Sequence, residues 1–278
     1  MILIADSGSS KTAWSSINNS AVAECITSGI NPFFLDSADI IQLLKNEFTL
    51  GKENLQKVFF YGAGCVHEKK QVIYKALRVF FNTDNISVDN DLLGAARALC
   101  QNKPGIVCIL GTGSNSCYYN GNEITRHISP LGYILGDEGS GAVLGKRLVA
   151  DILKNQLPKD IRDDFFTMYL LTEGEIMENV YRKPFPNRFL AQFTKFIDGH
   201  IDKPELNELV NNCFKEFIHR NIMKYGEQVL HLPINFTGSV ACIFRANLEN
   251  VLNDCGLSIG KVTQSPMAGL IEYHLNIS

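Results

Sequence analysis

The chain lacks several features that would assign it to a specialised class of protein. No apolar run approaches the roughly 20 residues that a membrane-spanning helix needs, and the opening residues MILIADSGSS lack the basic flank of a signal peptide. The eight cysteines include no CxxC pair, so they fit neither a zinc site nor an iron–sulfur cluster. The net charge is only −3, which gives no attraction to nucleic acid or an anionic membrane. We therefore expect a cytoplasmic protein that binds neither nucleic acid nor a membrane.

The composition is that of an ordinary packed protein, with 45% hydrophobic and 20% charged residues. A length of 278 residues is enough for two modest domains. Strand-like stretches alternate with helical ones, which favours an α/β fold. We expect a helix over 37–48 capped by Ser37, another over 241–256, and a last helix that starts at Pro266.

A turn rich in serine follows the first predicted strand. DSGSSKT spans residues 6–12, and its small residues would let backbone N–H groups approach an anion, with Ser10, Lys11 and Thr12 as further donors. Asp6, at the strand end, could hold Mg²⁺ through water. The phosphate-loop pattern GxxxxGK[ST] is absent. Taken alone, the stretch favours a plain hairpin turn over an anion site.

A second strand with a similar turn begins at residue 105. GIVCILGTGSN ends in a glycine turn with the hydroxyls of Thr112 and Ser114, and CILGTGSNSCY resembles IADSGSSKTAW in form, which indicates a weak internal repeat. A third glycine turn, FTGSVA at 236–241, suits a phosphate or ribose contact before a helix. A routine strand-to-helix loop explains this third turn about equally well.

Several carboxylates stand at predicted strand-to-helix junctions. Asp89 and Asp91 occupy one such junction, where one of them should cap the helix and the other could accept the proton of a substrate hydroxyl. Asp137 and Glu138 stand between glycines before a helix, where they could cap it or hold a polar ligand. Asn31, in SGINPFF, could contact a sugar hydroxyl, although a turn role is the simpler explanation.

Taken in order, these motifs resemble the superfamily of sugar kinases, heat-shock chaperones and actin, known as ASKHA. Within it they resemble the branch of N-acetylglucosamine kinases and BadF/BadG-type ATPases. The resemblance covers nearly the whole chain. Its most specific part is ILGTGSN followed by GYILGDEGSG about twenty residues later. It implies two ribonuclease-H-like α/β domains with a nucleotide cleft between them. We place the first at 1–110 plus 266–278, and the second, with a helical insertion, at 111–265.

The resemblance also implies roles for individual residues. It places Asp6 near Mg²⁺ and Asp91 as the catalytic base. The ATP contacts that it implies are Ser9, Ser10, Lys11, Thr12, Gly111, Thr112, Gly113 and Ser114 for the phosphates, and Gly238 and Ser239 for the adenosine side. The sugar contacts are Asn31, Gly132 and Asp137, and Glu138 either shares their work or caps the next helix. Here Ser9 and Ser10 stand where the family usually has glycine and threonine.

These observations predict an ATP- and magnesium-dependent kinase that phosphorylates N-acetylglucosamine, or a related N-acetylhexosamine, at its 6-hydroxyl. Such a protein belongs to amino sugar metabolism, and a homodimer would suit its helical second domain. Two alternatives remain open. The first is an ATPase that activates a reductase or dehydratase through an iron–sulfur cluster, for which Cys65 is the only partial ligand candidate. The second is a sugar sensor without catalysis.

Overall fold

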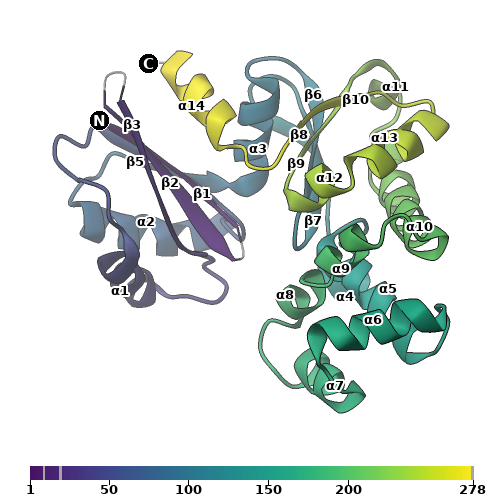
Figure 1. Ribbon diagram of the computed structural model, residues 1–278. Helices are drawn as coiled ribbons and strands as arrows, with labels where there is room; N and C mark the ends of the chain where they lie inside the picture. The colour runs from purple at the N-terminus through teal and green to yellow at the C-terminus, as the bar shows by residue number, and fades with distance from the viewer. Residues whose placement is uncertain (9, 19–20, 277–278) are drawn as a thin grey trace. The chain divides into compact units, whose positions relative to one another are not determined.

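The computed structural model describes residues 1–8, 10–18 and 21–276. The chain divides into two compact units (Figure 1). Unit 1 comprises Met1–Pro104, Tyr119–Thr125 and Ser265–Ser278, and unit 2 comprises Gly105–Tyr118 and Arg126–Gln264. The predicted domain boundaries at residues 110 and 265 stay a prediction, because compactness alone does not define a domain.

Unit 1 is built on a five-stranded sheet of order β3-β2-β1-β4-β5. Strand β1 is antiparallel to β2 and parallel to β4, which is in turn parallel to β5. The elements are β1 (Ile2–Ser7), β2 (Lys11–Asn18), β3 (Ala21–Ser28), α1 (Ser37–Glu47), β4 (Lys57–Gly62), the 3₁₀ turn η1 (His67–Lys69), α2 (Lys70–Phe81), β5 (Ile86–Asn90), α3 (Asp91–Cys100) and α14 (Met267–Asn276).

Alternation along β1 divides the core of unit 1 between the two faces of the sheet. Leu3 and Ala5 belong to one cluster together with residues of α1 and α2, which pack against each other (Figure 1). Ile4 belongs to a second cluster with residues of α3 and α14. Trp14 is fully buried in the first cluster, and its ring centroid lies 5.3 Å from that of Phe48. Helices therefore cover both faces of the sheet.

Unit 2 repeats this plan with a sheet of order β10-β9-β6-β7-β8, in which β9 is parallel to both β6 and β10. Its strands are β6 (Gly105–Leu110), β7 (Ser114–Tyr119), β8 (Ile124–Ile128), β9 (Ile234–Thr237) and β10 (Ile259–Thr263). Its helices are α4 (Gly132–Leu135), α5 (Gly141–Leu153), α6 (Lys159–Tyr169), α7 (Glu173–Tyr181), α8 (Pro186–Ala191), α9 (Thr194–Gly199), α10 (Pro204–Arg220), η2 (Ile222–Tyr225), α11 (Gln228–His231), α12 (Ser239–Ile243) and α13 (Arg245–Asp254).

The shared strand order confirms the α/β fold with two ribonuclease-H-like domains, and the weak repeat noticed in the sequence corresponds to the first two strands of each sheet. Some local predictions were wrong. Asp36, not Ser37, caps α1, because its carboxylate accepts from the N–H groups of Ala38 and Asp39. The helix predicted over 241–256 is broken at Phe244 into α12 and α13.

Close contact between α5 and α8 depends on Gly145. A Cβ atom added there would lie 1.9 Å from the carbonyl oxygen of Leu190, so the two helices would have to separate. We expect Gly145→Ala to lower the free energy of unfolding by about 1–3 kcal/mol, as overpacking does. In contrast, Gly174→Ala in α7 adds a Cβ that lies 4.0 Å from the Thr172 hydroxyl oxygen, and should stabilise the protein by about 0.5–1 kcal/mol. Thermal unfolding of both variants checks this, and equal shifts would contradict it.

Within the part of the chain that the structure describes, each helix is either too short or too polar to cross a membrane. The cytoplasmic location and the homodimer stay predictions.

Candidate functional site

In unit 1 the carboxylates of interest lie at the carboxyl ends of parallel strands, where open α/β sheets bind ligands. The sheet register pairs Asp6 of β1 with Tyr61 of β4, and Tyr61 with Asp89 of β5. Asp91 follows at the start of α3. Burial, and next the charge of Asp91, raise the pKa of Asp6 to about 7, although Lys11 opposes this shift. Asp6 and Asp91 are therefore close enough to repel each other as anions.

Asp91 is held where α3 begins. Its Oδ1 accepts a hydrogen bond from the N–H of Leu92 at 2.9 Å. Burial raises the pKa of Asp91 to about 6, against the lowering effect of that hydrogen bond. The expectation that Asp89 or Asp91 caps the helix was wrong, because the cap is Asn90, whose Oδ1 accepts from the N–H of Leu93 at 2.7 Å. Neither aspartate is needed for capping.

Asp89 instead belongs to a chain of polar contacts that the sequence did not reveal. Its carboxylate lies 2.8 Å from Lys70 Nζ and 3.7 Å from Arg97 Nη1. Arg97 also donates to the hydroxyl of Tyr61 at 2.9 Å, and that hydroxyl lies 2.9 Å from His274 Nε2. These polar contacts connect the end of β5 to α14. They pair the charge of Asp89, which precedes Asp91 by two residues, with the cations Lys70 and Arg97.

Cys65 is buried in the same region. Burial, and next the charge of Asp91, raise the pKa of its thiol to about 12, so the thiol stays protonated and is a poor nucleophile or metal ligand. Among the residues that the structure describes, no group of three or more histidine, cysteine or acidic side chains could hold a metal ion.

The turn between β1 and β2 is a hairpin with an internal hydroxyl network. Ser7 and Thr12 are buried, and their hydroxyl oxygens lie 2.7 Å apart. Both accept from the N–H of Ile30, at 3.1 and 3.2 Å. Thr12, predicted as a phosphate donor, is thus engaged inside the hairpin. Ser10 and Lys11 are exposed, and Ser9 lies outside the described residues.

Asn31 adopts the turn role that the sequence also allowed. Its Oδ1 accepts from the N–H of Phe33 at 2.9 Å, and its backbone carbonyl accepts from Phe34 and Leu35. Gly64 faces this side chain, since a Cβ there would lie 2.5 Å from Asn31 Oδ1. The Nδ2 donors of Asn31 are not used in this turn.

In unit 2 the loop after β6 is closed tightly and docks on a helix. The N–H of Gly111 donates to the carbonyl of Gly113 at 2.9 Å. The first N–H groups of α5, those of Gly141 and Ala142, donate to the carbonyls of Gly111 and Thr112 at 2.8 and 3.0 Å. A Cβ on Gly111 would meet nothing within 4 Å, so this part of the loop is open to a ligand.

Asp137 lies against the same loop. Its Oδ1 accepts from the N–H of Ser114 at 3.3 Å, and a Cβ on Gly113 would lie 3.0 Å from its Oδ2. The residue has a φ of 54°, a left-handed conformation that aspartate tolerates better than most residues. Burial raises the pKa of its carboxyl to about 6. Gly132, five residues earlier, is exposed and has a φ of 74°.

Glu138 has a different role from its neighbour. It is buried, its carboxylate lies 2.9 Å from Arg220 Nε, and it accepts from Asn221 Nδ2 at 3.3 Å. The alternative that it caps the next helix was wrong, because Ser140 caps α5 by accepting from the N–H of Val143. Glu138 therefore ties the loop before α5 to the end of α10.

The third glycine turn meets the second inside unit 2. Gly238 has a φ of 119°, and a Cβ there would lie 2.3 Å from the carbonyl oxygen of Leu110. Ser239, the first residue of α12, is exposed. Strand β10 contributes as well, because the N–H of Gly238 donates to Thr263. No strand was expected from the residues that form β10.

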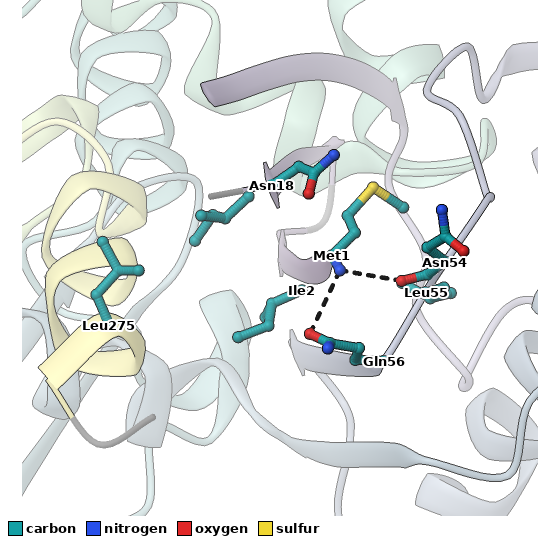
Figure 2. A pocket seen from close by; sticks show the side chains of 8 residues that line it. Met1, Ile2, Asn18, Asn54, Leu55, Gln56 and Leu275 are labelled. Atoms are coloured by element: carbon teal, nitrogen blue, oxygen red, sulfur yellow. Dashed lines mark hydrogen bonds between the residues drawn. The ribbon is translucent and has the colours of Figure 1, made fainter. Parts of the chain in front are cut away.

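A separate pocket of about 540 Å³ lies in unit 1 beside Met1, Asn18 and Gln56 (Figure 2). The Met1 amine donates there to the Asn54 carbonyl at 3.0 Å and contacts Gln56 Oε1 at 3.3 Å (Figure 2). This pocket is at the amino end of β1, and Asp6 is near the other end. It is therefore distinct from the carboxylates described above.

Comparison with known proteins connects this geometry to sugar kinases. No protein-family model matches the chain. A crystal structure of a candidate N-acetylglucosamine kinase from Porphyromonas gingivalis is 48% identical, with a TM-score of 0.96 and 99% of each chain covered. Another candidate N-acetylglucosamine kinase, from Chromobacterium violaceum, is 16% identical, with a TM-score of 0.75 and 98% of each chain covered, and it supports the fold alone.

A curated relative points in the same direction. The N-acetylmuramic acid/N-acetylglucosamine kinase of Clostridium acetobutylicum is 28% identical over 204 residues, which are 70% of this chain. The matched stretch spans 61% of the length of that protein.

Proposed function

Because the chain belongs to the N-acetylglucosamine kinase family, a family of carbohydrate kinases, we propose that it transfers the γ-phosphoryl group of ATP to the 6-hydroxyl of N-acetylglucosamine or a related N-acetylhexosamine. Phosphoryl transfer requires a group that orients the attacking hydroxyl, donors for the phosphate oxygens, and contacts that hold the sugar. The described residues include candidates for each of these tasks.

The buried carboxyl of Asp91, at the start of α3, is the observation on which the proposal rests. Burial raises the pKa of its carboxyl to about 6, so most of the carboxyl is ionised at neutral pH and can still take a proton. A catalytic base works best when its pKa is near the operating pH. We propose that Asp91 accepts a hydrogen bond from the sugar hydroxyl and takes its proton as the new P–O bond forms and the bond between the γ-phosphorus and the departing ADP breaks.

The phosphate contacts are assigned to backbone and hydroxyl groups. In unit 2 they are assigned to Gly111, Thr112, Gly113 and Ser114, and Gly238 and Ser239 serve the adenosine side. The N–H groups of Gly111 and Ser114 already donate within the protein, so the hydroxyls of Thr112 and Ser114 are the candidate donors of this loop. In unit 1, Ser10 and Lys11 are the exposed donors of the first turn. Donors fixed in position can stabilise the charge on the transferred group at little reorganisation cost.

Asp6 is the candidate ligand for Mg²⁺. Repulsion from Asp91 contributes to its raised pKa, so a cation at Asp6 would offset unfavourable charge there. A single carboxylate with water and phosphate oxygens is a usual set of magnesium ligands. Mg²⁺ would neutralise charge on the phosphate oxygens when bound.

The sugar contacts are assigned to Asp137, Asn31 and Gly132. The Asp137 carboxylate has one contact to the Ser114 N–H, which leaves acceptor capacity for ring hydroxyls. Asn31 has Nδ2 donors left over from its turn. Glu138, which was expected to share this work, is engaged with Arg220, so we assign it a supporting role.

The proposal is tested with purified protein, Mg-ATP and a panel of hexoses and N-acetylhexosamines in a coupled ADP assay. We expect N-acetylglucosamine or a close relative to be the best substrate, with the product phosphorylated at the 6-position as read by NMR. Turnover of plain hexoses alone would overturn the amino-sugar assignment. Sugar binding without ATP turnover would overturn the kinase assignment and favour a sugar sensor without catalysis.

The pH dependence of turnover probes the charges around Asp91. Because the base acts when ionised, kcat/KM should fall as the pH drops through about 6. Asp89→Asn removes a neighbouring anion and leaves the Lys70 charge unpaired, and both changes favour ionised Asp91. We therefore expect the acidic limb of the profile to move to lower pH. The double variant Asp89→Asn/Lys70→Met should move it back toward the wild-type position. An unchanged limb in both variants would show that this pair does not act on the base.

A further inference from the structure

A second pocket, of about 590 Å³, lies within unit 2 among helices α4, α5, α7 and α8. Its walls are mainly apolar and include Val149, Leu153, Ile176, Val180 and Leu190. The volume falls within the range of small-molecule sites, which bury apolar groups and use a few polar ones for orientation. None of the roles proposed above uses this pocket.

The pocket and Asp137 are joined by one short segment. Tyr133 and Ile134 of α4 line the pocket. The turn that they form is closed by hydrogen bonds from the N–H of Gly136 to the Gly132 carbonyl, 2.7 Å, and from the N–H of Asp137 to the Pro130 carbonyl, 2.8 Å. The proposed sugar contacts Gly132 and Asp137 therefore flank the two residues that line the pocket.

Lys146 provides a second connection. It lines the pocket, and its Nζ donates to the Tyr133 carbonyl at 2.8 Å. It is also near enough to Asp137 for its charge to lower the pKa of that carboxyl, against the larger effect of burial. Lys146 therefore connects the wall of the pocket with the electrostatic surroundings of Asp137.

We propose, on the basis of the function proposed above, that this pocket receives the N-acyl arm of the amino sugar and accepts arms longer than acetyl. The amide carbonyl of the acyl arm would remain near Lys146. Its hydrocarbon chain would lie along Val149, Leu153 and Ile176. An acetyl group has only one methyl group to bury, whereas a cavity of this volume has room for several methylenes. The apolar part of the walls favours a hydrocarbon chain.

The test compares N-acetyl-, N-butanoyl- and N-hexanoylglucosamine as substrates of the full chain. Each methylene that becomes buried should raise kcat/KM roughly threefold to fourfold. Allowing for incomplete burial, we expect N-hexanoylglucosamine to exceed N-acetylglucosamine by at least tenfold. The quantity measured is this ratio, so a change common to all substrates cancels.

Two adjacent residues of α7 provide matched variants. Met177 lines the pocket, and Glu178 is exposed and is not among its lining residues. Met177→Trp should fill the pocket and reduce the ratio to about one or below, whereas Glu178→Trp should leave it unchanged. Thermal unfolding of both variants checks that they are folded.

The outcomes separate the two proposals. Phosphorylation of N-acetylglucosamine with a ratio near or below one, or a high ratio that Met177→Trp does not reduce, overturns the acyl pocket and leaves the kinase assignment intact. Absence of phosphorylation with every amino sugar overturns the kinase assignment and the acyl pocket with it.

Discussion

Asp91→Asn should reduce kcat for amino-sugar phosphorylation by about a thousandfold, in the middle of the range that removal of a general base produces. The amide can still accept the hydrogen bond from the Leu92 N–H, which the carboxylate accepts at 2.9 Å, so the start of α3 should keep its structure. What the variant loses is the ability to take the hydroxyl proton. Steady-state kinetics with the best amino sugar measure the effect.

Two control measurements belong to this variant. Sugar affinity, measured by calorimetry, should change little, because the substituted group still forms hydrogen bonds. Stability should change in a direction that depends on pH. The folded-state pKa of Asp91 is about 6, above the ordinary value of 3.8, so its favourable contribution is complete below the ordinary value and is lost as the pH rises through 6. Asp91→Asn should therefore raise the melting temperature at pH 8 and leave it nearly unchanged at pH 3.

Near-normal turnover by Asp91→Asn would exclude it as the base. A thousandfold loss accompanied by lost sugar binding and a lower melting temperature at pH 8 would indicate a structural role instead.

Asp137→Asn should raise the KM for the sugar by about a hundredfold and leave the KM for ATP nearly unchanged. Hydrogen bonds to a charged group contribute roughly 1.5–3 kcal/mol each, and the variant loses the charge and one acceptor atom. Asparagine suits the left-handed backbone at this position, and its Oδ1 can still accept from the N–H of Ser114. The change therefore affects the ligand more than the loop.

Asp137→Gly is the matched variant, because glycine keeps the same backbone conformation but cannot hold Ser114. It should raise the KM for ATP as well as that for the sugar, since the loop over 111–114 loses an anchor. If Asp137→Asn raised only the KM for ATP, the carboxylate would act through the loop and would not contact the sugar.

The sequence predicted the architecture better than it predicted the contacts of individual side chains. Strand ends and glycine turns follow from local residue patterns, so the positions of Asp6 and the loop over 111–114 could be anticipated. The helix caps were harder, because Asp36 and Asn90 are each adjacent to another residue that caps equally well. Only backbone geometry decides between such neighbours.

Contacts between residues far apart in the sequence could not be predicted either. Lys70 meets Asp89 across 19 residues, and Tyr61 meets His274 across 213 residues, and no local pattern signals either contact. Glu138 illustrates the consequence. Its place beside Asp137 suggested a shared role, but its partner Arg220 lies at the end of a distant helix.

The single tryptophan of the chain, Trp14, is buried in the aromatic cluster of unit 1. Indole emission depends on solvent exposure, so fluorescence excited selectively at tryptophan should report the unfolding of unit 1 and be nearly blind to unit 2. Far-ultraviolet circular dichroism, in contrast, is weighted toward the many helices of unit 2. Comparing the two signals along one denaturant titration would reveal whether the halves of the molecule lose their structure together or one after the other.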